Sequence, residues 1–394
     1  MRNFSYIYIA LTLVFGVFLY DYLGKSFGMT FIDELLMVAL LSYGIMKSER
    51  TKEIKCVTLC FVFYLVYSLC FGVACYQAIF TDLIIYLKPF VGLYVVLGTG
   101  MCLSQSAKKK TKRIVLFIAF TTLVSCVVSY SFVASTLMGH PSRLATLFEI
   151  LGVAYYYCSS RTKKDLGYTM FFFCCSMLSV RSKSYVFVVI AFFIFYYLQA
   201  WKLTKMRFST IFSIILCIGI VFVVGWEKFQ FYFIQGSNAD MTESFARPAL
   251  YQGAFLILKD YFPFGSGFGS YACYASSEYY SPLYYKYGLY NVWGLSEDHS
   301  GFIADTFFPQ LAQFGIIGVV LFIAFLVRRY KDTIRYYMVN EDGNLMKISL
   351  LVLAFFLVES SSDSTFVHNR GMAMMVLWGM IMNESKYKCV VQKK

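Results

Sequence analysis

The chain has 394 residues, of which 59% are hydrophobic and 14% are charged, and its net charge is +13. An ordinary soluble domain carries about 25% charged residues, so this composition excludes a soluble globular protein and indicates a multi-pass membrane protein.

In chain order, apolar runs of roughly 18 residues predict an all-α fold with about 12 transmembrane helices. The first run is followed by no small-residue cleavage site, so we expect an uncleaved anchor. The predicted segments lie near 5–23, 28–46, 56–76, 80–103, 114–138, 144–159, 168–180, 185–200, 208–225, 308–327, 348–362 and 370–383. They divide the chain into 1–225 with transmembrane helices 1–9, a large loop at 226–307, and 308–394 with transmembrane helices 10–12 and a tail.

Most of the 35 Lys and Arg fall in alternate connections between these segments. The positive-inside rule assigns such connections to the cytoplasm. We therefore expect both termini in the cytoplasm and the 226–307 loop outside. Topology explains the positive charge, so no nucleic-acid partner is expected. The 12 cysteines lie mostly in apolar runs without C-x-x-C spacing, which predicts neither a disulfide framework nor a zinc site.

Several cations break the positive-inside pattern. An unpaired cation at the centre of a membrane helix costs about 2.5–3.5 kcal/mol, so such residues are functional candidates. Arg181 lies in the polar segment 178–184 between two short apolar runs. This segment is expected below the outer surface, where it lines a cavity. The alternative is a plain outer turn whose cations reach the lipid headgroups.

Arg247 precedes Pro248 and a stretch, 248–259, that is expected to form an amphipathic helix along the outer membrane face. The helix would hold Arg247 over a cavity. The alternative is a surface salt bridge between Arg247 and Glu243.

Two further motifs follow in the loop. The glycine run at 265–269 fits neither a P-loop nor a dinucleotide fingerprint and is expected to form a tight turn after the amphipathic helix, with close approach of a ligand as the alternative. His299 stands beside Glu297 and Asp298. A neighbouring carboxylate can fix the imidazole tautomer that a general base requires. A structural histidine at the membrane interface is the alternative.

These motifs occur in an order that resembles the O-antigen polymerase and ligase superfamily. The resemblance covers about 170–325: a serine–arginine element at 179–182, Arg247 before a helix, the glycine run, the segment 297–300, and 312–318. The family usually has Asn where Ser300 stands, and it has Ser-Arg directly where Val180 intervenes.

The resemblance implies a glycosyltransferase that uses sugars on undecaprenyl pyrophosphate at the outer face of the bacterial plasma membrane. Arginine forks bind phosphate oxygens, so Arg181 and Arg247 are the expected clamp on the leaving group and His299 the expected proton acceptor. Inversion at the anomeric carbon is expected, with no metal or other cofactor. Further substrate-binding residues are expected at Arg143, Lys88, Lys183, Glu297 and Asp298.

The predicted activity is polymerisation of oligosaccharide repeat units into O-antigen, capsule or exopolysaccharide. One alternative is a ligase that transfers the glycan to lipid A core or protein. Another is a twelve-helix transporter, which predicts related halves with helices interrupted at matching positions. The expected partners are the lipid-linked donor and acceptor, membrane lipids, a chain-length regulator and a flippase.

Overall fold

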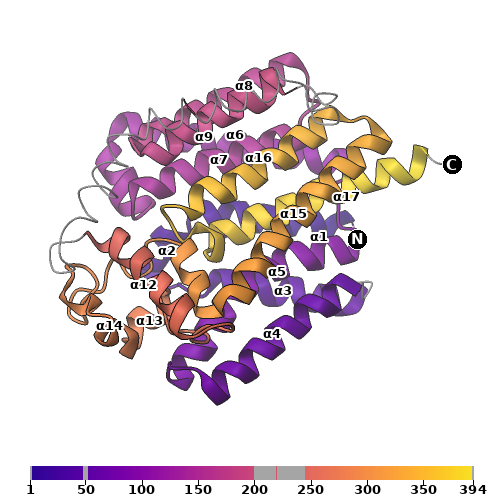
Figure 1. Ribbon diagram of the computed structural model, residues 1–394. Helices are drawn as coiled ribbons and strands as arrows, with labels where there is room; N and C mark the ends of the chain where they lie inside the picture. Colours follow the sequence, from indigo (N-terminus) through magenta and orange to yellow (C-terminus); the bar gives the residue numbers. More distant parts are fainter. Residues whose placement is uncertain (1, 48–51, 199–218, 220–244, 393–394) are drawn as a thin grey trace.

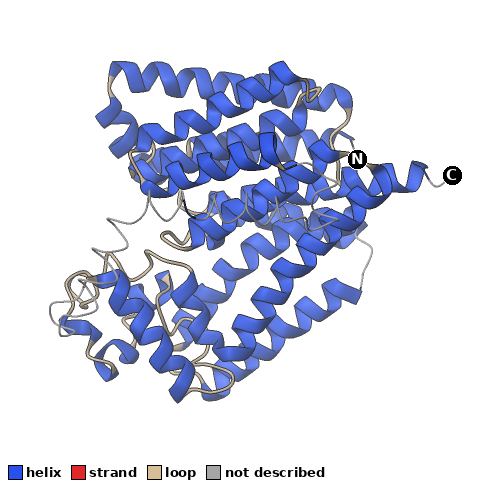
Figure 2. Cartoon of the chain, turned by 45° about the horizontal axis from the view of Figure 1, so that its top comes forward, coloured by secondary structure: helices blue, strands red, loops and turns tan. Residues whose placement is uncertain are grey.

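The computed structural model describes residues 2–47, 52–198, 219 and 245–392. These residues form helices and turns without a strand (Figure 2), which confirms the predicted all-α class for this part of the chain. The predicted helix at 208–225, apart from residue 219, lies outside the described residues, as do 226–244 of the predicted loop and Glu243.

The helices overlap the predicted apolar segments, although the segment predicted at 114–138 corresponds mainly to a helix at 105–128. In chain order they are α1 (Arg2–Leu11), η1 (Thr12–Phe18), α2 (Tyr20–Phe27), α3 (Ile32–Lys47), α4 (Lys52–Phe71), α5 (Tyr76–Thr99), α6 (Gln105–Val128), η2 (Phe132–Leu137), α7 (Pro141–Cys158), α8 (Lys163–Ser176), η3 (Met177–Ser179), α9 (Ser182–Phe192), η4 (Phe193–Tyr197), α12 (Ala246–Asp260), α13 (Tyr274–Glu278), α14 (Pro282–Lys286), η6 (Leu289–Asn291), η7 (Phe308–Phe314), α15 (Gly315–Asn340), α16 (Gly343–Ser360), η8 (Thr365–Val367) and α17 (Asn369–Gln392).

Among the described residues, 5 helices are long and apolar enough to cross a membrane: α4, α5, α6, the continuous η7–α15 segment, and α16. The count rises to 6 if the first helices are one span, bent by 61° before α2. The other helices are shorter or carry more polar residues. A set of about 12 transmembrane helices therefore stays a prediction.

Helix α17 forms the centre of the bundle. Its residues 372–378 and 380–382 are all buried, and it packs most extensively against α5. Glycines allow this approach: a Cβ at Gly379 would lie 2.8 Å from a methyl carbon of Val96, and a Cβ at Gly92 would lie 3.1 Å from the carbonyl oxygen of Met372. Small residues at helix crossings are the usual means of close packing in membranes.

Residues 245–314 form a unit of short helices with its own apolar core. Helix α12 covers the predicted amphipathic stretch and buries Leu250, Ala254 and Ile257, which recur at helical spacing on one face. Leu250 and Ile257 pack with Tyr271 and Tyr284 from the following segment. Figure 1 shows α12, α13 and α14 together at one end of the bundle, away from the two chain ends.

The glycine run joins this unit to the bundle. Gly265, Gly267 and Gly269 have left-handed φ values of 82°, 89° and 73°, which favour glycine. The backbone N–H of Gly269 donates to Asp82 of α5 over 2.9 Å, and a Cβ at Gly269 would lie 2.6 Å from the backbone of Ala78. The run is therefore a point of close backbone contact that fixes the unit on α5.

Candidate functional site

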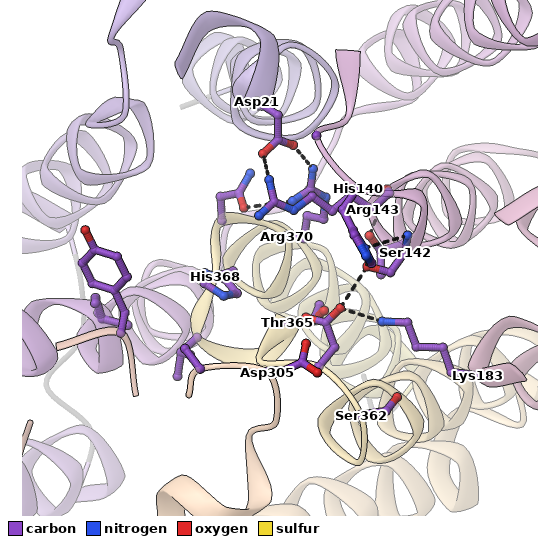
Figure 3. A pocket seen from close by; sticks show the side chains of 18 of the residues that line it. Asp21, His140, Ser142, Arg143, Lys183, Asp305, Ser362, Thr365, His368 and Arg370 are labelled. Atoms are coloured by element: carbon purple, nitrogen blue, oxygen red, sulfur yellow. Dashed lines mark hydrogen bonds and ion pairs between the residues drawn. The ribbon is translucent and has the colours of Figure 1, made fainter. Parts of the chain in front are cut away.

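A cavity of about 1520 Å³ lies where the 245–314 unit meets the bundle. Figure 3 shows side chains that converge on it from separate helices. Its walls come from α2 and α3, the first half of α5, the starts of α7, α9 and α12, the loop before η7, and the turn between α16 and α17. Its charged and histidine side chains are Asp21, Lys25, Asp33, Glu34, Lys88, His140, Arg143, Arg181, Lys183, Arg247, Asp305, Asp363, His368 and Arg370.

Three acidic residues from the N-terminal helices, Asp21, Asp33 and Glu34, pair with cations that line the cavity. Asp21 of α2 accepts hydrogen bonds from both Arg143 and Arg370 (Figure 3). Lys88, in the interior of α5, lies 2.6 Å from a carboxylate oxygen of Asp33 and also contacts Glu34. The Lys88 side chain is only 7% exposed, and a buried charge requires such partners. Lys88 therefore lines the cavity with its positive charge balanced by these two carboxylates.

The positive charge of Lys183 is also balanced by two carboxylates. Its ammonium group lies 2.8 Å from Glu359 and 2.7 Å from Asp363. Burial raises the pKa of the Asp363 carboxyl, whereas the charge and the hydrogen bond of Lys183 lower it. The lowering prevails, so the net pKa lies well below its usual range. The second carboxylate explains why an ammonium group can lie so deep at the start of α9.

Arg247 reaches the cavity from the first turn of α12. Its guanidinium donates to the carboxylate of Asp305, with Nε and Nη2 at 2.7 Å and 2.5 Å from the same oxygen. Burial raises the pKa of Asp305, and this effect outweighs the lowering by Arg247. The pair places a cation and a carboxylate with a raised pKa on one wall.

Arg181 and Lys25 differ from these cations. Arg181 shares a hydrogen bond of 3.2 Å with His140, and Lys25 donates to the carbonyl oxygen of Ser135 over 2.8 Å. Neither has a carboxylate within 4.0 Å among the described residues. Lys25 also lies close to Arg143: both side chains come within 3.5 Å of the point that a Cβ at Gly139 would occupy.

The positive charge therefore gathers at the start of α7. Lys25 and Arg181 lack acidic partners in the described part of the chain, and Arg143 shares a single aspartate with Arg370. The N-terminus of an α-helix adds a partial positive charge and free N–H groups. This side of the cavity suits an anion with several oxygens, such as a phosphate or pyrophosphate.

The sequence motif 297–299 lies elsewhere. Glu297, Asp298 and His299 are exposed and do not line the cavity, and Glu297 accepts a hydrogen bond of 2.5 Å from Tyr285. Gly301, two residues after His299, does line it, so the motif lies near the cavity along the chain. The predicted roles of these three residues stay predictions.

The sequence reasoning missed the histidines that do line the cavity. Of the three histidines the sequence motifs single out only His299, yet His140 and His368 both belong to the wall. Pro141 and Ser142 after His140 are a helix-start signal that could have identified the start of α7. Burial lowers the pKa of His368 to about 4, so this imidazole is neutral at pH 7.

The described residues contain no group of three or more His, Cys, Asp or Glu arranged to hold a metal ion. Comparison with known families adds one finding: residues 167–323 match the family model of the O-antigen ligase. No curated protein matches the chain. The match confirms the superfamily resemblance. The matched segment, which begins in α8 and ends in α15, includes Arg181, Arg247 and Asp305.

Proposed function

We propose that this protein of the O-antigen polymerase and ligase superfamily joins oligosaccharide repeat units carried on undecaprenyl pyrophosphate, at the outer face of the bacterial plasma membrane. The family match supports a glycosyltransferase-like enzyme that acts on lipid-linked sugars. The observation that carries the proposal is the surplus of positive charge around the start of α7. It faces a cavity of about 1520 Å³, larger than the roughly 300–1,000 Å³ of an ordinary small-molecule site.

In this proposal a hydroxyl of the acceptor sugar attacks the anomeric carbon of the donor. The bond from that carbon to the pyrophosphate oxygen breaks, and the pyrophosphate leaves with the electron pair. Arg181, with Arg143 and Lys25, holds the leaving group, because arginine forks bind phosphate oxygens in pairs. Charges already in place where the negative charge develops are often the largest catalytic contribution. Attack opposite the leaving group inverts the anomeric carbon.

Arg247 is the second arm of the proposed clamp. Arg247 of α12 and Arg181 at the start of α9 line the same cavity. Asp305 compensates its charge before substrate binds. Lys88 and Lys183, each held by two carboxylates, are proposed to shape the cavity and to contact sugar hydroxyls together with these acids.

The attacking hydroxyl must also release a proton. His299 is the proposed acceptor, because Gly301 beside it reaches the cavity wall and a neutral imidazole suits general-base catalysis. Asp305 is a second candidate, because it lines the cavity itself and burial raises its pKa. A carboxylate with a raised pKa is a stronger base than an ordinary one.

A polymerase and a ligase would use the same donor and differ in the acceptor. A transporter is the least supported alternative, because the family match favours a glycosyltransferase-like enzyme. The experiment that separates them is analysis of the lipid-linked and surface glycans of a strain that lacks this protein. Single repeat units indicate a lost polymerase. Long chains that remain on the lipid carrier would instead indicate a ligase, and unchanged glycans would contradict both.

Metal independence is part of the proposal, because cationic side chains already lie where a metal would otherwise balance the pyrophosphate charge. Extension of the lipid-linked repeat unit by purified protein should continue after divalent ions are chelated. Loss of activity with EDTA, restored by magnesium or manganese, would require a metal in the clamp.

A further inference from the structure

Arg181 is held by an uncharged side chain. Its Nη2 atom lies 3.2 Å from Nε2 of His140. Lys88, Lys183, Arg143, Arg247 and Arg370 on the same cavity all contact carboxylates. An imidazole can orient a guanidinium through a hydrogen bond without cancelling its charge. This contact therefore leaves Arg181 both placed and fully charged.

The neighbours of His140 decide its tautomer. A guanidinium can only donate hydrogen bonds, so the Arg181 contact requires Nε2 to accept and the ring proton to be on Nδ1. Nδ1 lies 2.7 Å from Oγ of Ser142, and the backbone N–H of Ser142 also points at Nδ1 over 3.2 Å. A neutral imidazole can accept from Arg181 or from this N–H but not from both. Because Oγ of Ser142 donates to Asp363, Oγ can accept from Nδ1, and this favours the tautomer that has the proton on Nδ1 and the Arg181 contact at Nε2.

The chain of contacts continues to a fixed charge. Oγ of Ser142 donates to a carboxylate oxygen of Asp363 over 3.2 Å. The same oxygen accepts from Lys183 over 2.7 Å. Lys183 is further held by Glu359. The imidazole thus lies at the end of a series of hydrogen bonds that starts at a buried ion pair.

We propose that His140 is a positioning residue for Arg181: the neutral imidazole, fixed in its Nδ1–H tautomer by Ser142 and Asp363, directs the guanidinium toward the leaving pyrophosphate. The inference rests on the proposed function. It adds a residue outside the segment that matches the family. His140 accepts a hydrogen bond from the cation that binds the phosphate and takes no part in bond formation.

The positioning requires a neutral imidazole. Burial and then Arg181 lower the pKa of His140, with smaller lowering by Arg143 and Lys183, whereas Asp363 raises it. Lys25 is a further cation nearby, close to Gly139. The net shift is downward, so His140 is neutral at pH 7. Below its lowered pKa it gains a proton on Nε2, loses the Arg181 contact and repels the guanidinium, so activity should fall on the acid side.

The matched variants His140→Gln and His140→Glu test this. Residue 140 has extended backbone, with φ −159° and ψ 142°, which suits any residue before a proline. Each variant is purified, its folding is checked by thermal unfolding, and kcat and KM are measured against pH. The probe is the lipid-linked repeat unit extracted from a strain that lacks this protein.

The neutral glutamine oxygen can still accept from Arg181, so His140→Gln should keep kcat/KM within about threefold of wild type and lose the acid-side fall. His140→Glu neutralises Arg181 and should raise KM by at least about tenfold, and His140→Ala should lose about 10–100-fold, the range for a hydrogen bond to a charged group. Equal losses in His140→Gln and His140→Ala would overturn the proposal, because the imidazole itself would then be required.

An unchanged acid-side fall in His140→Gln, or a His140→Glu protein as active as His140→Gln, would also overturn it. The proposed function fails in a different way. In that case the wild-type protein does not extend the repeat unit at any pH, or Arg181→Ala extends it at the normal rate.

Discussion

At the scale of single residues, a cation's partners decide what it can do. Lys88 and Lys183 each contact two carboxylates, whereas Arg181 contacts an imidazole. Because two carboxylates more than cancel one positive charge, only the second arrangement leaves charge for a ligand. The spacing of Lys and Arg in the sequence does not distinguish the two cases. The three-dimensional contacts identify Arg181, together with Lys25, as a cation available to a phosphate.

Substitution of Arg181 should therefore reduce catalysis more than folding. We expect Arg181→Ala to slow extension by about 10²–10³, the usual cost of one preorganised electrostatic donor. Arg181→Lys should recover little, because a point charge does not reproduce the planar fork. Lys286→Ala is the matched control: Lys286 is an exposed cation that pairs with Asp260, away from the cavity. Rates are compared at equal protein abundance in membranes, and a near-normal rate for Arg181→Ala would remove it from the clamp.

Lys183 should matter first for stability. Lys183→Met leaves Glu359 and Asp363 without their cation, and breaking a buried pair in this way costs about 3–5 kcal/mol. Glu149 of α7 is the control, because it is fully buried and neither of its carboxylate oxygens has a hydrogen-bond partner among the described residues. Such a group carries a proton, so Glu149→Gln should leave the thermal unfolding temperature almost unchanged. A stable Lys183→Met protein would contradict the assigned ion pair.

At the scale of helices, glycines at the α5–α17 crossing allow these two helices to approach closely. A Cβ at Gly379 would lie 2.8 Å from a methyl carbon of Val96, so Gly379→Leu should destabilise the protein by about 1–3 kcal/mol through overpacking. Gly167 of α8 has no atom of the described residues within 4 Å of its Cβ position, and Gly167→Ala should be neutral or slightly stabilising. Thermal unfolding in detergent measures both, and equal stability of the two variants would contradict the close crossing.

Helix positions could be predicted from the sequence, but the candidate site only in part. Apolar length and period locate a helix such as α5 or α16 because they depend on neighbours along the chain. Contacts such as that between Asp21 and Arg370 join residues at opposite ends of the sequence. Patterns among neighbouring residues of a single sequence cannot predict such contacts. Arg181 and Arg247 were found because they break the charge bias, whereas His140 breaks no rule that a single sequence displays.

At the scale of the whole molecule, the 245–314 unit lies at one end of the bundle and the two chain ends at the other (Figure 1). The cavity lies where that unit meets the bundle. The orientation in the membrane stays a prediction. Single cysteines placed in a cysteine-free background test it in intact cells. An impermeant thiol reagent should label Lys286→Cys but neither Lys109→Cys nor Lys331→Cys, and labelling at 109 would reverse the topology.

The central claim is that this cavity joins lipid-linked repeat units. The most direct test is incubation of the purified protein, in lipid nanodiscs, with the repeat unit extracted from a strain that lacks it, followed by separation of the products by chain length. We expect a ladder of lipid-linked chains from the wild-type protein, and from Arg181→Ala at equal concentration the same ladder forming about 10²–10³-fold more slowly. Unextended single units from correctly folded wild-type protein would contradict the claim.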